Sequence, residues 1–118
     1  MKIHHLALQV TEIETCEKFY RDVLQLPFLE YKYDETGKIR SAWFDADGTI
    51  LMLEKVETKN IDSALNVLAF NIAPAERSAW QKKLQAAKIK PDHESKFTIY
   101  FSDPAGNQLA FSHYPHEV

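Results

Sequence analysis

The sequence has 118 residues, of which 45% are hydrophobic and 26% are charged, and its formal net charge is −3. This length and balance are typical of one globular domain and exclude a disordered chain. The acidic balance argues against nucleic-acid binding, no apolar run is long enough to span a membrane, and the single cysteine, Cys16, precludes an internal disulfide. We therefore expect a cytoplasmic protein that binds neither nucleic acid nor membranes.

The first half of the chain predicts a strand, a helix and three further strands. Residues 5–10 (HLALQV) have the pattern of a strand, and residues 11–24 that of an amphipathic helix, with Thr11 and Glu14 spaced as a capping box. Three strands are predicted at 27–34, 39–45 and 49–56. Asp47-Gly48 separates the last two strands, and this dipeptide is typical of a tight hairpin.

The second half repeats the same order of elements. Residues 67–72 (VLAFNI) align with 5–10 at an offset of 62 residues, which pairs His5 with Val67. A helix follows from Pro74, and three strands are predicted at 88–94, 97–101 and 107–114. Gly48 and Gly106 align at an offset of 58 residues, which pairs Met52 with Ala110.

This duplication predicts one α+β domain built from two βαβββ modules. Module one covers residues 1–56, a polar linker covers 57–63, and module two covers 64–118. We expect the modules to form a bent mixed sheet whose concave face is a cup for a small-molecule ligand.

Four stretches carry a resemblance to a known family: IHHLALQV (3–10), FYRDVL (19–24), AWFDADGTILMLE (42–54) and IYFSDPAGNQLAF (99–111). They resemble the vicinal oxygen chelate superfamily, which includes glyoxalase I, fosfomycin and bleomycin resistance proteins, extradiol dioxygenases and methylmalonyl-CoA epimerase. The resemblance implies the glyoxalase-like fold and a homodimer, for which exposed strand edges give a physical reason. Gln25 departs from the family, which usually has glycine at this helix end.

The resemblance also implies up to four metal ligands, one from the first and one from the last strand of each module. These positions fall on His5, Met52, Val67 and Ala110. Three apolar side chains cannot hold Mg²⁺, Mn²⁺, Ni²⁺ or Zn²⁺, so we expect no metal cofactor. The alternative is a divalent metal ion held by His5 and Glu54, because Glu54 shares a strand face with Met52.

Strand alternation predicts which side chains line the cup. The predicted lining is His5, Gln9, Trp43, Met52, Glu54, Asn71, Tyr100, Gln108 and Ser112, with the facing of Trp43 and Tyr100 left open. We interpret the chain as a metal-independent small-molecule-binding protein, similar to the bleomycin resistance branch. The alternatives are a divergent glyoxalase-type lyase or isomerase with His5 and Glu54 as acid and base, a regulatory module, and a cup filled by its own side chains.

The remaining histidines are predicted to have structural or surface positions. His4 and His5 are adjacent on a predicted strand, so their side chains should point in opposite directions, His5 into the cup and His4 away from it. We expect His93, His113 and His116 on the surface or in the C-terminal tail, and Cys16 buried in the first helix.

Overall fold

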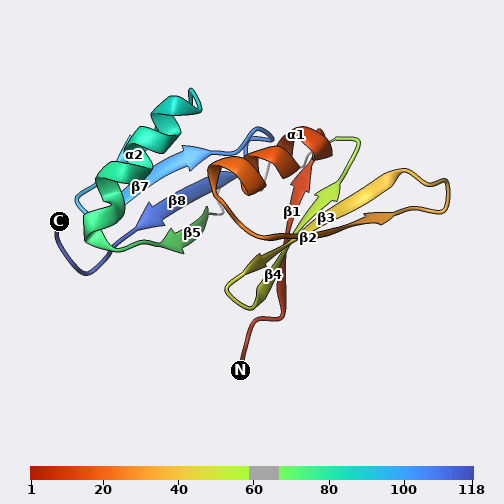
Figure 1. The fold of residues 1–118 in the computed structure, drawn as a ribbon, viewed down its shortest axis with the longest axis horizontal. Helices are drawn as coiled ribbons and strands as arrows, with labels where there is room; N and C mark the ends of the chain where they lie inside the picture. Colours follow the sequence, from red (N-terminus) through yellow and green to blue (C-terminus); the bar gives the residue numbers. More distant parts are fainter. Residues whose placement is uncertain (59–66) are drawn as a thin grey trace. The chain divides into compact units, whose positions relative to one another are not determined.

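The computed structural model describes residues 1–58 and 67–118 (Figure 1). The chain divides into two compact units, Met1–Ile61 and Asp62–Val118, called unit 1 and unit 2 below. Most of the predicted linker, residues 59–63, and the start of predicted module two lie outside the described residues. No helix in the described parts of the chain is long and apolar enough to cross a membrane.

Unit 1 has the predicted order of strand, helix and three strands. Its elements are β1 (His5–Val10), α1 (Ile13–Lys18), a π-helical turn (Phe19–Val23), β2 (Phe28–Tyr33), β3 (Ile39–Ala46) and β4 (Thr49–Lys55). The sheet order is β1-β4-β3-β2, in which β1 is parallel to β4 and the other pairs are antiparallel. The β3–β4 turn has positive φ at both Asp47 (54°) and Gly48 (91°), as the predicted hairpin requires.

Unit 2 repeats this architecture. Its elements are β5 (Val67–Asn71), a 3₁₀ turn (Pro74–Glu76), α2 (Arg77–Ala86), β6 (His93–Glu94), β7 (Thr98–Ser102) and β8 (Gln108–Ser112). The sheet order is β5-β8-β7-β6, again with only its first pair of strands parallel. The predicted α+β fold of two βαβββ modules is therefore confirmed, with one mixed four-stranded sheet in each unit.

The strand registers reproduce the internal repeat. In unit 1, His5 pairs with Ile50 and Ala7 pairs with Met52. In unit 2, Val67 pairs with Gln108 and Ala69 pairs with Ala110. The same residues thus correspond at offsets of 62 and 58 that the sequence alignment predicted.

In each unit one face of the sheet packs against the helix. In unit 1 the buried side chains of this face are Val10, Ala42, Phe44, Leu51 and Leu53, and α1 and the turn after it bury Ile13, Cys16, Phe19, Tyr20 and Leu24. In unit 2 the corresponding residues are Ile99, Phe101, Leu109 and Phe111, with Leu84 from α2. Because strand side chains alternate, the other residues of each strand lie on the opposite, helix-free face.

Two local predictions need correction. The first helix begins at Ile13 with Glu12 as its N-cap and no side-chain capping bond, so the Thr11–Glu14 capping box is wrong. The strand predicted at 88–94 is reduced to His93–Glu94. The residues before it close the end of α2, because the N–H groups of Lys88 and Ile89 donate to the carbonyls of Gln85 and Leu84, and Pro91 has no N–H for a ladder.

Candidate functional site: the helix-free sheet faces

The helix-free face of unit 1 contains every site residue predicted for the first module. Strand registers place on it His5, Ala7, Gln9, Glu30, Lys32, Ser41, Trp43, Asp45, Ile50, Met52 and Glu54. Trp43 pairs with Met52 on one side and Glu30 on the other, which fixes its facing. The face combines one large aromatic ring with small, apolar and charged neighbours.

The helix-free face of unit 2 contains the site residues predicted for the second module. The registers place on it Val67, Ala69, Asn71, His93, Thr98, Tyr100, Ser102, Gln108, Ala110 and Ser112. Tyr100 pairs with Ala110, as Trp43 pairs with Met52 in unit 1. Thr98 and Ser112 share a hydroxyl hydrogen bond of 3.0 Å between their Oγ1 and Oγ atoms.

On each face the aromatic ring contacts side chains of its own strand or of a neighbouring one. The Trp43 indole Nε1–H donates to Ser41 Oγ at 3.0 Å, and Lys32 Nζ lies 4.8 Å from the centroid of the Trp43 ring. Lys32 also forms an ion pair with Glu30. In unit 2 the His93 ring stacks on Tyr100, with centroids 5.8 Å apart and planes inclined by 26°.

The two N-terminal histidines converge rather than diverge, so the predicted opposite orientation is wrong. Strand β1 begins at His5, and alternation therefore does not extend to His4. Their Nδ1 atoms lie 3.0 Å apart and their rings meet edge to face at 5.2 Å. The Nδ1–H of one ring donates a hydrogen bond to Nδ1 of the other, and both side chains are exposed.

His5 and Glu54 share the helix-free face of unit 1, but the registers keep them apart. His5 pairs with Ile50, and Glu54 lies four residues farther along β4, opposite Gln9. Four residues of strand span about 13 Å, and two side chains that leave one sheet face in the same direction do not close such a gap. General acid and base groups must both reach the reacting atoms, and the ligands of one ion must lie closer still.

The four positions that the resemblance implies for metal ligands carry few groups that could hold a divalent ion. Of the four, only His5 carries a donor, because the others are Met52, Val67 and Ala110. Met52 pairs across the strands with Ala7, and Ala110 with Ala69, which add no donor, whereas Val67 pairs with Gln108, which adds an amide oxygen. Among residues 1–58 and 67–118, no group of three or more His, Cys, Asp or Glu side chains is arranged to hold a metal ion.

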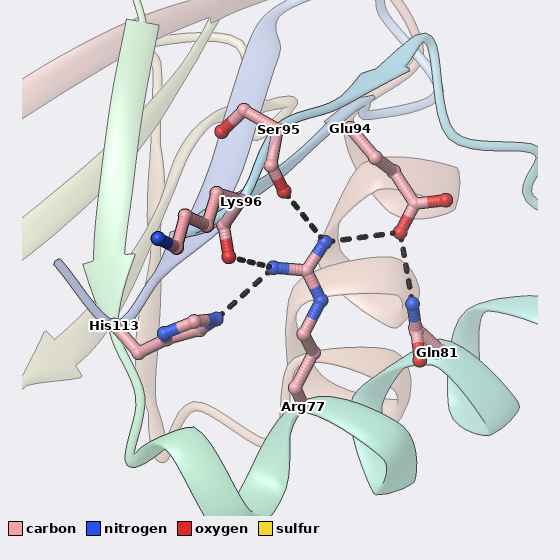
Figure 2. Close-up of polar contacts among 6 residues, drawn as sticks. All are labelled: Arg77, Gln81, Glu94, Ser95, Lys96 and His113. Carbon is pink, nitrogen blue, oxygen red and sulfur yellow. Dashed lines mark hydrogen bonds and ion pairs between the residues drawn. The ribbon is translucent and has the colours of Figure 1, made fainter. Parts of the chain in front are cut away.

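Sequence reasoning missed a polar network on the helix side of unit 2 (Figure 2). His113 is only 1% exposed, so its predicted surface position is wrong, whereas His93 and His116 are exposed as expected. The backbone N–H of His113 donates to the Phe97 carbonyl at 2.9 Å, which extends the β7–β8 ladder by one residue. Alternation of Leu109, Phe111 and His113 was the sequence signal for this burial.

Arg77 of α2 is the centre of this network. Its Nη1 donates to the Lys96 carbonyl at 3.2 Å and to His113 Nε2 at 3.0 Å, and its Nη2 donates to the Ser95 carbonyl at 3.0 Å. Nη2 also forms an ion pair with Glu94 at 3.4 Å. These contacts join α2 to the β6–β7 turn and the end of β8, on the side away from the helix-free face (Figure 2).

Two βαβββ modules in consistent repeat register, each with a sheet face free of its helix, define the vicinal oxygen chelate class of fold. The sequence matches the Glyoxalase/Bleomycin resistance protein/Dioxygenase superfamily over residues 2–111, and the chain belongs to this superfamily.

Three known proteins show how similar the chain is to other members of this superfamily. The metallothiol transferase FosB of Lysinibacillus sphaericus (strain C3-41) is 29% identical, and the alignment covers 92% of this chain and 79% of that protein. A glyoxalase/dioxygenase from Nostoc punctiforme is 26% identical with a TM-score of 0.79, covering 98% of this chain and 92% of that one. Lactoylglutathione lyase from Agrobacterium tumefaciens shares the fold, with a TM-score of 0.75 at 22% identity, covering 96% and 93% of the two chains.

Proposed function

We propose that this protein is a metal-independent small-molecule-binding member of the superfamily. The observation that supports this most is the agreement between sequence repeat and strand register at the four ligand positions. In the strand registers His5 occupies the position of Val67, and Met52 that of Ala110. Shifting the alignment of one module against the other therefore does not restore the missing donors. Each helix-free face offers an aromatic ring and apolar side chains with dispersed polar groups, which suits a small, partly apolar ligand.

The printed names of some relatives point to metal chemistry, and this proposal departs from them. FosB is called a metallothiol transferase, and a fosfomycin resistance protein from Listeria monocytogenes was crystallised with Mn(II). Identity to these proteins is 29% and 16%. We do not transfer their reactions to this chain, because three of its four ligand positions are apolar.

The divergent lyase or isomerase remains the second hypothesis, but the separation of His5 and Glu54 argues against it. We also propose a cytoplasmic homodimer. Strands β1 and β5 each lie at the edge of their own sheet, and such edges carry backbone groups that a second copy can pair with.

Metal content and metal affinity test the proposal directly. The untagged protein is analysed for bound elements after purification and is then titrated with Ni²⁺, Zn²⁺ and Mn²⁺ by calorimetry. We expect no stoichiometric binding in the wild type. His5→Ala and Glu54→Ala serve as the matched variants, and stoichiometric binding that is lost in both would overturn the proposal and favour the glyoxalase-like enzyme.

A further inference from the structure

The residue that pairs across the strands with the aromatic ring differs between the two modules. In unit 2, Tyr100 pairs across the strands with His93, whose flat imidazole stacks on the phenol ring. In unit 1 the equivalent ring is Trp43, and its cross-strand partner is Glu30. A carboxylate therefore stands beside the indole where the second module supplies a flat nitrogen heterocycle.

The Trp43 ring already attracts a cation of the protein itself. Lys32 Nζ lies 4.8 Å from the ring centroid, a distance at which an ammonium ion is held by the negative face of an indole. Lys32 is also paired with Glu30, and the two side chains are 38% and 52% exposed. A lysine held only by partly exposed contacts of this kind is readily displaced.

The indole itself is held in place. Its Nε1–H donates to Ser41 Oγ at 3.0 Å, and Ser41 is buried, with 2% of its surface exposed. Ser41 and Lys32 are cross-strand partners, as are Trp43 and Glu30, so the four residues form a square on β2 and β3. A ring fixed before binding loses little conformational freedom when a ligand stacks on it.

The charge of this face favours a cation. Among the strand residues that the registers place on it, the acidic ones are Glu30, Asp45 and Glu54, and Lys32 is the one lysine. A ligand that replaces the Lys32 ammonium on the ring can take over its pairing with Glu30. An anionic ligand would instead meet three carboxylates.

We propose that the helix-free face of unit 1 binds a planar aromatic cation, which stacks on Trp43, pairs with Glu30 and displaces the Lys32 ammonium. This inference rests on the proposed small-molecule-binding function and names its ligand class. The ligand supplies in module one what His93 supplies in module two, a flat nitrogen-containing group against an aromatic ring. Lys32 occupies the position in the unliganded protein and competes with the ligand.

Three small probes separate planarity from charge. Benzamidinium is a planar aromatic cation, benzoate is its anionic isostere, and cyclohexanecarboxamidinium keeps the charge without the aromatic ring. Each is titrated into ¹⁵N-labelled protein, and the indole N–H signals of Trp43 and Trp80 are followed by NMR. Trp80 is an internal control, because it also has a lysine above its ring, with Lys83 Nζ at 5.7 Å, but it belongs to α2.

We expect benzamidinium to shift the Trp43 signal and leave the Trp80 signal in place, with weaker effects from the other two probes. Trp43→Leu should lower the affinity for benzamidinium about tenfold, and Glu30→Gln about fivefold. Lys32→Met should raise it about threefold, because it removes the competing cation. Lys83→Met makes the same change of net charge beside Trp80 and should leave the affinity unchanged.

Several results would overturn the inference. Equal or tighter binding of benzoate would contradict the ligand class, and equal shifts of both indoles would show a general affinity for tryptophan. A loss of affinity in Lys32→Met would make Lys32 a ligand contact instead of a competitor. If no probe moves Trp43 while an unrelated compound from a library shifts other signals of the helix-free faces, this inference fails and the proposed function stands. Stoichiometric metal binding would remove the proposed function itself.

Discussion

Arg77 Nη1 donates a hydrogen bond of 3.0 Å to Nε2 of His113, and this contact determines which ring nitrogen of the histidine carries the proton. A guanidinium has only donors, so His113 Nε2 accepts. On the other side of the ring, Nδ1 lies 2.6 Å from the His116 carbonyl, which can only accept. The two contacts together require a neutral imidazole with its proton on Nδ1.

The first prediction is this tautomer. Long-range ¹H–¹⁵N correlation spectra of the protein at neutral pH should give His113 the pattern of an Nδ1-protonated neutral ring. His116 is exposed and lies three residues away, so its ring serves as the reference within the same spectrum. A spectrum in which His113 carries its proton on Nε2 would mean that Arg77 does not contact it in solution.

The second prediction concerns the stability that Arg77 provides. Arg77→Met removes the Arg77 hydrogen bonds to the carbonyls of Ser95 and Lys96 and to Nε2 of His113. The free energy of unfolding, measured in urea, should therefore fall by about 2 kcal/mol. Arg77→Lys should retain only part of the stability that Arg77 provides, because one ammonium cannot reach all three acceptors. Arg40→Met, at an exposed position, is the matched control and should change stability by less than about 0.5 kcal/mol. Equal stability of Arg77→Met and the control would contradict this role.

The fold could be predicted from the sequence because the internal repeat consists of local residue patterns. Alternation located β1 and β5, and the aligned glycines located the last hairpin of each module, which together determine the register of the ligand positions. His4 and His113 were misplaced for a different reason. Their environments depend on where a strand begins or ends, at His5 in one case and one residue beyond Ser112 in the other. Alternation after Leu109 and Phe111 did point to a buried His113, but how far a strand extends at each end is decided by the structure, where element boundaries are the least predictable feature.

The third prediction uses two non-glycine residues in left-handed backbone conformations. Gln25 has φ 58° and ends the first helical segment, and Lys88 has φ 60° and ends α2. Glycine adopts this conformation without the clash of a Cβ, so Gln25→Gly and Lys88→Gly should each stabilise the protein by about 0.5–1 kcal/mol. Gln85→Gly, inside α2, is the control and should destabilise by about 1 kcal/mol. Thermal and urea unfolding measure all three, and destabilisation by the first two would contradict the argument.

The fourth prediction concerns the ionisation of Tyr31. Burial, and then the hydrogen bond of its hydroxyl to Glu17 at 2.9 Å, raise the pKa of Tyr31 from 10.0 to about 12. Since the folded state disfavours the phenolate, the stability linked to this group is complete below about pH 10 and is lost as the pH rises towards about 12. NMR titration of ¹³Cζ-labelled tyrosine should show one late transition that disappears in Tyr31→Phe. Glu17→Gln should move that transition to lower pH, and an unchanged midpoint would exclude Glu17 as a cause.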